Sequence, residues 1–284
     1  MAAEIWTPLK LIAWAQGYLA RADADAPRLT AELLLAHALG CERLRLYLDF
    51  DKPLAEPELA RYRLLLKRRA DGEPTAYLVG VKEFYGRCFR IDARALIPRP
   101  ETELVVEAAL DHLPATGGVA LDLCTGSGCV GITLALERPG SRVLASDVSA
   151  DALALARENA EQLGVRLELL QGDLFAPIPA DVRFDVIAAN PPYVPTAELG
   201  RLARELHREP VLALDGGDDG LSVTRRLVSD AAARLRPGGA LVVEMHESHL
   251  EALPALCLEL GFEDAEARRD LANLPRFVVA RAKA

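Results

Sequence analysis

Apolar positions in the first 70 residues recur at intervals of three and four, as on amphipathic helices. Five positions carry the first such stripe: Leu9, Ile12, Ala13, Gln16 and Leu19. Thr30 is a suitable N-cap for a second helix over residues 31–39 that ends at Gly40, and Pro57 stands where a further helix begins. The pattern predicts a small bundle of three to five helices.

The pattern changes after Asp71. Residues 81–91 alternate apolar and polar side chains around Gly86, which predicts a β-hairpin, and residues 96–103 lead into a helix that runs to Leu113. We therefore expect three parts: a helical domain over residues 1–72, a β-hairpin linker over residues 73–100 and a larger domain over residues 101–284.

From Gly118 onward, short apolar runs alternate with longer helical patterns. The expected strands are 119–123, 142–146, 167–170, 184–189 and 240–244, with a closing antiparallel strand at 276–280. The expected helices are 129–137, 150–163, 221–235 and one that ends at Leu260. Alternation of this kind predicts an α/β fold with a doubly wound parallel sheet.

Composition limits where this protein acts. Apolar residues make up 51% of the chain, but none of its apolar stretches reaches the length of a membrane span without a charge, and the N-terminus lacks a basic segment. We expect no membrane span and no signal peptide. The five cysteines are scattered (Cys41, Cys88, Cys124, Cys129 and Cys257). Their spacing is not that of a zinc site, and a reducing cytoplasm is expected.

Charge is distributed unevenly. Residues 1–90 carry +2 (14 Lys and Arg, 12 Asp and Glu), whereas the remaining 194 residues carry −11 (19 and 30), which gives −9 in all. An acidic larger domain argues against a broad surface that binds nucleic-acid phosphates. One helical stretch is basic, with Arg61, Arg63, Lys67, Arg68 and Arg69. It is either a solvated helix face or a docking surface.

A glycine-rich turn follows the first strand of the predicted parallel sheet. It comprises Asp122, Leu123, Cys124, Thr125, Gly126, Ser127 and Gly128. Glycines there allow the backbone to approach a ligand, and the next helix offers free N–H groups, although tight strand–helix packing also uses glycine. Asp147 ends the next strand, where a carboxylate can accept hydrogen bonds from ribose hydroxyls. After the third strand, Phe175 is expected either over a purine, with Asp173 near its amino group, or in the core.

The fourth strand ends in Asn190, Pro191, Pro192 and Tyr193. Two prolines fix the backbone, so the Asn190 side-chain oxygen and a neighbouring carbonyl can accept both hydrogens of a planar NH2 group, and Tyr193 can cover that group. In open α/β sheets, ligands bind at the carboxyl ends of the strands. An amine acceptor loop suits methyl transfer from S-adenosylmethionine, and it offers nothing for hydride transfer.

Together these motifs resemble the class I methyltransferases, and within them the release factor glutamine methyltransferases of the PrmC or HemK family. The resemblance spans nearly the whole chain and rests on residues 72–77, 83–86, 96–103, 122–128, 172–175, 190–193, 209–210 and 216–221. It implies a seven-stranded methyltransferase sheet, together with a small N-terminal helical domain that docks the substrate. The implied reaction methylates the glutamine amide of the Gly-Gly-Gln loop in class I peptide release factors, in support of translation termination.

The resemblance also assigns residues to roles. It implies cofactor contacts by Cys124, Thr125, Gly126, Ser127, Gly128, Asp147, Phe175 and Asn190, and catalysis and glutamine binding by Asn190, Pro191, Pro192 and Tyr193. Arg99 and Glu101 match an interdomain motif. Cys124 stands where many members have glycine, a difference that matters if this residue needs a positive φ. His246, His249 and residues 273–275 also depart from the family pattern, and two histidines without a third ligand do not predict a metal site.

Several alternatives stay open at this point. A glutamine methyltransferase of a large-subunit ribosomal protein shares the Asn-Pro-Pro-Tyr loop, although residues 97–102 favour the release-factor group. A DNA adenine methyltransferase needs a basic cleft, which the acidic larger domain does not offer. A scaffold that only binds translation factors needs a broken cofactor site, whereas Gly126, Gly128, Asp147 and Asn190 are intact. We expect a monomer that makes no direct contact with nucleic acid.

Overall fold

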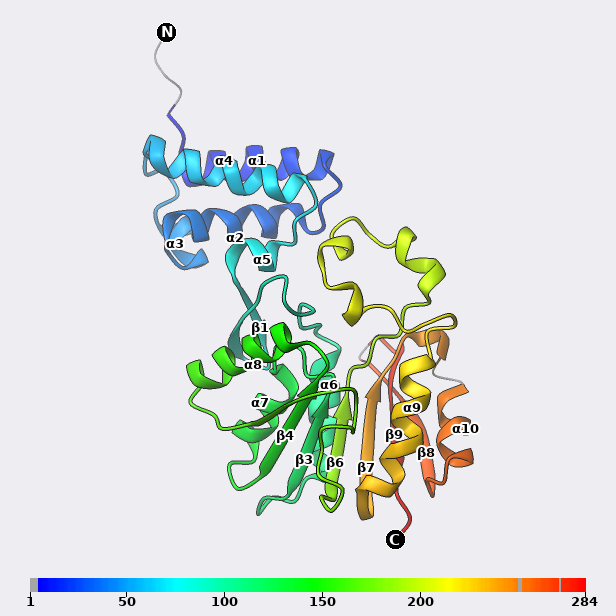
Figure 1. The fold of residues 1–284 in the computed structure, drawn as a ribbon. Coiled ribbons are helices and arrows are strands. Elements are labelled where there is room, and N and C mark those ends of the chain that lie inside the picture. The colour runs from blue at the N-terminus through cyan, green and yellow to red at the C-terminus, as the bar shows by residue number, and fades with distance from the viewer. Residues whose placement is uncertain (1–4, 250–251, 271) are drawn as a thin grey trace. The chain divides into compact units, whose positions relative to one another are not determined.

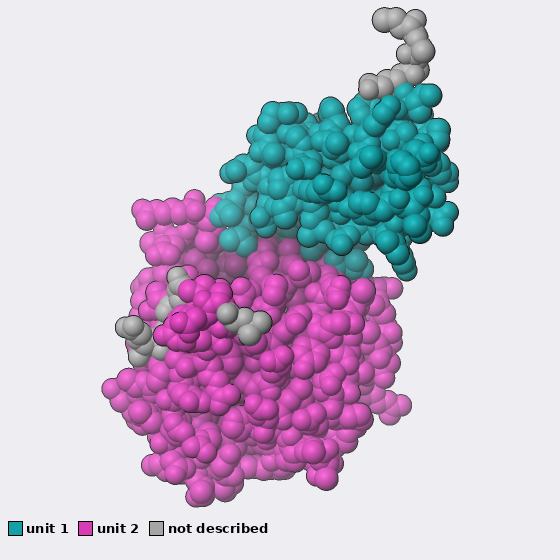
Figure 2. Space-filling model, turned by 180° about the vertical axis from the view of Figure 1, so that it is seen from behind, with its two compact units in different colours: residues 1–81, 203–208 teal, residues 82–202, 209–284 magenta. Residues whose placement is uncertain are grey.

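The computed structural model describes residues 5–249, 252–270 and 272–284. The chain divides into two compact units (Figure 2). The first contains Met1–Val81 together with Ala203–Arg208, and the second contains Lys82–Leu202 and Glu209–Ala284. The structure thus separates the units after Val81, and it assigns a short distant segment to the helical unit, which the sequence pattern did not indicate.

The first unit is helical (Figure 1). Its helices are α1 (Pro8–Arg21), α2 (Pro27–Leu39), α3 (Arg43–Leu48), α4 (Glu56–Ala70) and α5 (Thr75–Val79). Leu19, Leu34, Leu35 and Leu66 are fully buried between them, along with the ring of Tyr62. The Tyr62 hydroxyl donates to the Ala31 carbonyl at 3.0 Å, so the one polar atom of this side chain is paired within the core.

Two details of the helix predictions were wrong. The second helix begins one turn earlier than predicted, at Pro27, and Thr30 lies inside it with its hydroxyl donating to the Asp25 carbonyl at 3.1 Å. The buried face of α1 consists of Pro8, Leu11, Ile12, Ala15 and Leu19, whereas Leu9 is 50% exposed. Two apolar stripes overlap in this helix, and spacing alone does not distinguish between them.

The segment at residues 203–208 is fastened to the end of α4 by three arginines. The Arg69 side chain is 5% exposed and pairs with Glu205 at 2.8 Å. Arg204 donates to the Ala70 carbonyl at 3.0 Å, and Arg208 donates to the Asp71 carbonyl at 3.3 Å. These contacts explain why the segment belongs to the helical unit although about 130 residues separate the partners.

The predicted hairpin consists of β1 (Val81–Phe84) and β2 (Arg87–Arg90), and from Lys82 onward it belongs to the second unit. Tyr85 and Gly86 at its turn both have positive φ, 50° and 68°. That is the backbone of a type I′ turn, which suits the twist of two-residue hairpins. Phe84 and Phe89 turn inward and meet edge to face with ring centroids 6.0 Å apart.

Among the described residues, seven strands form one large sheet in the order β5-β4-β3-β6-β7-β9-β8. Their bounds are β3 (Val119–Leu123), β4 (Arg142–Asp147), β5 (Glu168–Gln171), β6 (Phe184–Ala189), β7 (Leu235–Glu244), β8 (Asp264–Arg269) and β9 (Pro275–Arg281). Neighbours from β5 to β7 are parallel, and β9 is antiparallel to both β7 and β8. The doubly wound seven-stranded fold is therefore confirmed.

Helices cover both faces of this sheet. They are α6 (Thr102–His112), α7 (Cys129–Glu137), α8 (Ala150–Gln162), α9 (Ser222–Ala231) and α10 (Ala252–Glu259). Alternate residues of β6 enter opposite cores: Val186 and Ala188 pack with α6 and α7, and Ile187 and Ala189 pack with α9 and α10. A strand buried on both faces has the continuous apolar sequence seen in β6. In the described part of the chain, no helix is long and apolar enough to cross a membrane.

Short 3-10 helices occupy several connections: η1 (Thr196–Arg201), η2 (Leu206–Arg208), η3 (Val211–Ala213), η4 (Ala232–Arg234) and η5 (Glu247–His249). The predicted bounds of β3, α7 and β6 match the structure. By contrast, β7 begins at Leu235, five residues before the predicted start, and β8 was missed. This edge strand is largely polar and exposed, so it lacks the apolar alternation that identifies a strand.

Candidate active site

A cavity of about 370 Å³ opens in the second unit where β3, β4, β5 and β6 end. Its volume lies within the range of roughly 300–1,000 Å³ that small-molecule and cofactor sites occupy. Of the residues predicted from the sequence, it is lined by Cys124, Thr125, Gly126, Ser127, Asp147, Asn190 and Pro192. The structure therefore brings the glycine-rich turn, the ribose carboxylate candidate and the amine acceptor loop to one cavity.

The glycine-rich turn uses left-handed backbone at three positions. Cys124, Gly126 and Gly128 have φ of 59°, 54° and 83°. A Cβ atom on Gly128 would approach Ala156 Cβ at 3.1 Å, so glycine is needed there to bring α7 against α8. Cys124 has a positive φ, so the presence of cysteine where many family members have glycine does matter for the backbone. Its side chain is half-buried against the core.

Asp122 holds this turn from within. Its Oδ2 accepts from the Thr125 hydroxyl at 2.6 Å and from the Gly131 N–H at 2.8 Å, and the residue is 2% exposed. Burial raises the pKa of Asp122 to about 7, while the two hydrogen bonds act in the opposite direction. The carboxyl thus ties the turn to the first turn of α7.

Asp147 lies directly across from the turn. One carboxylate oxygen accepts from the Gly126 N–H at 2.9 Å and the other accepts from the Ser149 N–H at 2.9 Å. Burial raises the pKa of this carboxyl, and its backbone hydrogen bonds oppose the shift. Each carboxylate oxygen has a second lone pair, so Asp147 can accept further hydrogen bonds from hydroxyl groups inside the cavity.

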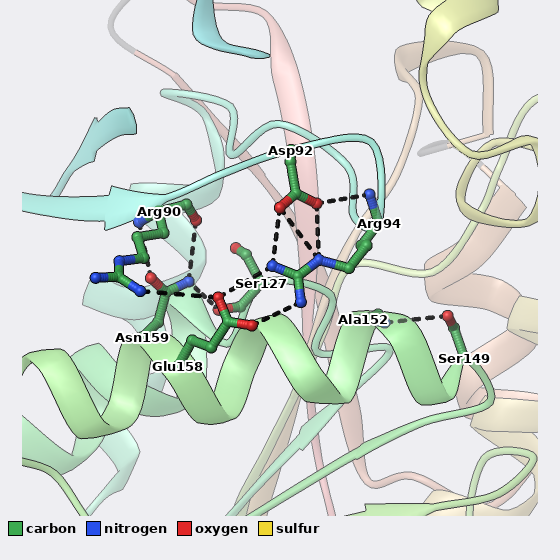
Figure 3. Close-up of polar contacts among 8 residues, drawn as sticks. All are labelled: Arg90, Asp92, Arg94, Ser127, Ser149, Ala152, Glu158 and Asn159. Carbon is green, nitrogen blue, oxygen red and sulfur yellow. Dashed lines mark hydrogen bonds and ion pairs between the residues drawn. The ribbon is translucent and has the colours of Figure 1, made fainter. Parts of the chain in front are cut away.

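Helix α8 anchors the rim of the cavity through side chains in Figure 3. Asn159 is fully buried, and its Nδ2 donates to the Ser127 carbonyl at 2.9 Å and to the Arg90 carbonyl at 3.1 Å. Arg94 lines the cavity and pairs with Asp92 and Glu158, both of which raise its pKa. The hairpin, the glycine-rich turn and α8 are therefore held together beside the cofactor candidate residues.

The structure places Phe175 in the core. Its side chain is 4% exposed, it belongs to the cluster that packs under α9, and Arg234 lies 5.8 Å from its ring centroid. The neighbouring Leu174, with φ of 48°, and Asp173 line the cavity instead. Phe175 therefore takes the core position, one of the two expected for it, and Leu174 is one of several apolar residues of the cavity lining that can contact a flat ring.

The acceptor loop leaves β6 with its side chains in different surroundings. Asn190 and Pro192 line the cavity, whereas Pro191 is buried behind them. Tyr193 packs against the core outside the cavity lining, with its ring centroid 6.3 Å from that of His246. Burial raises the pKa of Tyr193 to about 12, so the phenol stays protonated at neutral pH.

Two glycines allow the segment around residues 216–220 to pack closely against this loop. A Cβ atom on Gly216 would lie 2.8 Å from the Pro192 carbonyl oxygen, and one on Gly220 would lie 2.4 Å from the Tyr193 carbonyl oxygen. Gly220 also has a positive φ of 75°. The Val194 N–H donates to the Leu214 carbonyl at 2.9 Å, which adds a backbone tie. The loop is thus fixed by prolines within it and by glycines that pack against it.

Sequence reasoning missed two polar residues beside Asn190. Thr102 and Glu244 are 2% and 4% exposed, and the Thr102 hydroxyl donates to Glu244 Oε2 at 2.6 Å. Asn190 Nδ2 donates to Thr102 Oγ1 at 3.3 Å. Glu244 ends β7, and Thr102 begins α6. The family resemblance included Thr102 within a motif, but neither residue was predicted to belong to the site.

The segment around Arg99 is held by Glu209, which the family resemblance included within a motif without a role in the site. Arg99 Nη2 lies 2.6 Å from Glu209 Oε1, and the Ile97 N–H donates to Glu209 Oε2 at 3.0 Å. Glu209 is 4% exposed, and Arg99 lines the cavity. Glu101 lies outside the cavity lining and pairs with Arg276 at 3.5 Å. Arg99 therefore joins the site, whereas Glu101 contributes to its surroundings.

His246 lies near Tyr193, and the ring centroids of His246 and His249 are 6.3 Å apart. His246 Nδ1 is 2.8 Å from the Ser248 hydroxyl. Throughout the described ranges, no group of three His, Cys, Asp or Glu side chains is arranged to hold a metal ion. Residues 273–275 lie at the start of β9, where Asn273 has a φ of 62° and the Leu274 N–H donates to Asp270 Oδ1 at 2.9 Å.

The fold and the cavity together define a class I S-adenosylmethionine-dependent methyltransferase. Family models match two regions: the PrmC N-terminal domain over residues 10–80 and the methyltransferase small domain over residues 102–217. A release factor glutamine methyltransferase of Geobacter sulfurreducens is 44% identical over 279 residues, which are 98% of each chain. One from Chlorobaculum tepidum is 42% identical over 285 residues, which are 96% of each chain. The chain belongs to the release factor glutamine methyltransferase family, as the sequence motifs indicated.

Solved structures support the fold at much lower identity. A 16S rRNA methyltransferase of T. Thermophilus in complex with AdoMet and guanosine is 21% identical, with a TM-score of 0.54 over 72% of this chain and 50% of that chain. A methyltransferase from Pyrococcus furiosus is 20% identical, with a TM-score of 0.53 over 72% of this chain and 92% of that chain. These similarities concern the methyltransferase fold alone.

Proposed function

We propose that this protein transfers the methyl group of S-adenosylmethionine to the side-chain amide nitrogen of the glutamine in the Gly-Gly-Gln loop of class I peptide release factors. The observation that carries the proposal is the position of Asn190 and Pro192, which line the same cavity as Asp147 and the glycine-rich turn. An acceptor for an NH2 group thus adjoins the cofactor residues. Relatives that match nearly the full chain are named release factor glutamine methyltransferases.

The donor set of the cavity fits S-adenosylmethionine. Asp147 retains lone pairs for ribose hydroxyls, Leu174 offers apolar contact to a flat ring, and the turn from Cys124 to Ser127 lines the same cavity. When bound, this cofactor supplies an electrophilic methyl group on a sulfonium. The remaining work belongs to the protein, which has to hold the acceptor nitrogen in line with that methyl group.

An amide nitrogen is a poor nucleophile because its lone pair is delocalised into the carbonyl. We propose that Asn190 Oδ1 and a backbone carbonyl of Asn190 or Pro191 accept the two N–H hydrogens of the substrate. These hydrogen bonds strengthen as positive charge develops on nitrogen, which stabilises the transition state with dipoles already in place. The rigid loop also supplies orientation, and Tyr193 supports it from the core side. The proton can leave to water after transfer.

The helical unit is the proposed docking domain for the release factor. Several large apolar side chains are exposed on it: Leu9, Trp14, Leu44, Leu48 and Leu64 are between 47% and 66% exposed. Exposed apolar side chains of this kind suit a protein partner. On α4, Arg63 and Arg68 pair with Glu56 and Glu73, and Arg69 is buried against Glu205. We propose that the enzyme acts as a monomer in the cytoplasm, where translation termination takes place, and that it contacts no nucleic acid directly.

The test uses purified protein and S-adenosylmethionine with a labelled methyl group. Three acceptors are compared: a class I release factor, its variant with Gly-Gly-Ala in place of Gly-Gly-Gln, and a large-subunit ribosomal protein. Peptide mass spectrometry then locates the label. Label on the Gly-Gly-Gln glutamine, and loss of label in the alanine variant, supports the proposal. Label on the ribosomal protein alone, or cofactor binding without transfer to any acceptor, rejects it.

A further inference from the structure

We propose that Thr102 and Glu244 position the Asn190 carboxamide so that its oxygen, and not its NH2 group, faces the acceptor amide. This inference rests on the function proposed above and adds two positioning residues to it. Neither residue is required to touch the reacting atoms. Their role is to select one of the two orientations that a carboxamide can adopt in the same space.

Three elements of the second unit bring these side chains together. Asn190 follows β6, Glu244 ends the neighbouring strand β7, and Thr102 begins α6. The contacts form a chain: Asn190 Nδ2 donates to Thr102 Oγ1 at 3.3 Å, and the Thr102 hydroxyl donates to Glu244 Oε2 at 2.6 Å. Glu244 lies at the buried end of the chain, and Asn190 lies at the cavity.

The direction of these hydrogen bonds follows from what each group can donate. A threonine hydroxyl has one hydrogen, and an ionised carboxylate accepts only. The Thr102 hydrogen is therefore used by Glu244, which leaves a lone pair of Oγ1 toward Asn190. Only the NH2 end of a carboxamide can donate to that lone pair. The amide oxygen must then point the other way, toward the position where a substrate NH2 group needs an acceptor.

The protonation of Glu244 decides whether this direction holds. An ionised Glu244 fixes the Thr102 hydrogen, whereas a protonated one can itself donate to Thr102 and release that hydrogen toward Asn190. Burial raises the pKa of Glu244 to about 7, aided by the charge of Glu101 and opposed by the Thr102 and Asn190 hydrogen bonds and by Arg99. Tyr193 and the thiol of Cys129 also face this carboxyl. Positioning should therefore improve as pH rises through about 7.

The experiment compares Thr102→Val, Thr102→Ser and Glu244→Gln with the wild type on a class I release factor. We expect Thr102→Val to lower kcat about 10- to 100-fold, the same scale as when the hydrogen-bond partner that orients a metal-ligating side chain is removed. The dissociation constant of S-adenosylmethionine, measured by calorimetry, should change less than about threefold. Thr102→Ser keeps the hydroxyl and should restore kcat to within about threefold of the wild type.

The pH profile separates positioning from general loss of structure. Wild-type kcat should rise between about pH 6 and 8, and this limb should disappear in Glu244→Gln, because an amide does not titrate. Thr133→Val is the matched control: Thr133 is fully buried on α7, donates to the Cys129 carbonyl at 2.6 Å, and is not itself part of the cavity lining. It should lower the melting temperature and leave kcat unchanged.

The two proposals fail in different ways. If the wild type does not methylate the Gly-Gly-Gln glutamine, the proposed function is rejected. If the wild type does so but Thr102→Val stays within about twofold of it, or Glu244→Gln keeps the same pH limb, the positioning role is rejected. A drop in kcat that Thr133→Val reproduces also rejects it, because loss of any buried hydroxyl would then produce the effect.

Discussion

Cys124 is the position where the backbone conformation makes the sharpest prediction. Its φ of 59° lies in the left-handed region, in a turn whose other left-handed positions, Gly126 and Gly128, are glycines. We compare Cys124→Gly with Cys124→Ala. Both substitutions remove the same sulfur atom, so the loss of its packing cancels in the comparison, and the remaining difference is the presence of Cβ.

The expected magnitude follows from two opposing effects. A Cβ in the left-handed region costs about 1–2 kcal/mol, which the alanine variant keeps and the glycine variant loses. The glycine variant is in turn destabilised by about 0.4–1 kcal/mol, because glycine gives the unfolded chain more conformational freedom. Cys124→Gly should therefore be more stable than Cys124→Ala by about 0.5–1 kcal/mol, or a few degrees in melting temperature for a protein of this size.

The assay is thermal and denaturant unfolding of both variants, with Cys257 as the matched control. Cys257 is buried inside α10, where glycine should be less stable than alanine by about 1 kcal/mol. The order of the two variants should thus reverse between the two positions. If the alanine variant is the more stable one at position 124 as well, the left-handed conformation carries no strain there. The reasoning that a Cβ at this position costs stability is then refuted.

Three further predictions concern the site. Asn190→Ala should lower the methylation rate at least about a hundredfold, since an aligned electrostatic group is lost, with a smaller change in cofactor affinity; near-normal turnover would contradict its role. Asp147→Ala should chiefly raise the dissociation constant of S-adenosylmethionine in calorimetry, because charge-assisted hydrogen bonds are removed; an unchanged constant excludes the ribose contact. Asp122 has a folded-state pKa of about 7, raised from its usual value, so its contribution to stability is complete below about pH 4 and is lost as pH rises through 7. The wild type should lose on the order of 2 kcal/mol more than Asp122→Asn in unfolding free energy between pH 5 and 7.5, and parallel profiles would refute the shift.

The fold was largely predictable because its signals are local. The apolar run of β6, the glycine turn before α7 and the Tyr85-Gly86 hairpin each combine residues within a few positions of one another. β8 was missed because its residues are mostly charged or small and lie at a sheet edge, where pairing with β9 and not burial forms the strand. Propensity and periodicity do not detect a strand of that kind.

The site was predictable for residues whose position is determined by the end of the strand that they close or follow. Asp147 ends β4 and Asn190 follows β6, and both reach the cavity because the carboxyl ends of parallel strands meet at one edge. Phe175 shows the limit of this reasoning. The positive φ of Leu174 turns the chain, so that Leu174 lines the cavity and the ring of Phe175 enters the core. A sequence pattern does not reveal a left-handed residue that lacks the glycine or asparagine signature.

The contacts around Asn190 depend on strand register, which is a long-range property. β6 and β7 pair with Ala189 beside Val243, so Asn190 and Glu244 follow at the same level of the sheet, and Thr102 on α6 meets both. A shift of one residue in this register would place the apolar Val243 or Met245 there and exchange the faces of the whole strand. The acceptor loop therefore carries its chemistry in four consecutive residues. The orientation of its amide depends on two hydrogen bonds, Asn190 to Thr102 and Thr102 to Glu244, whose partners are 88 and 142 residues apart in the chain. Only the packed sheet brings those partners within hydrogen-bonding distance.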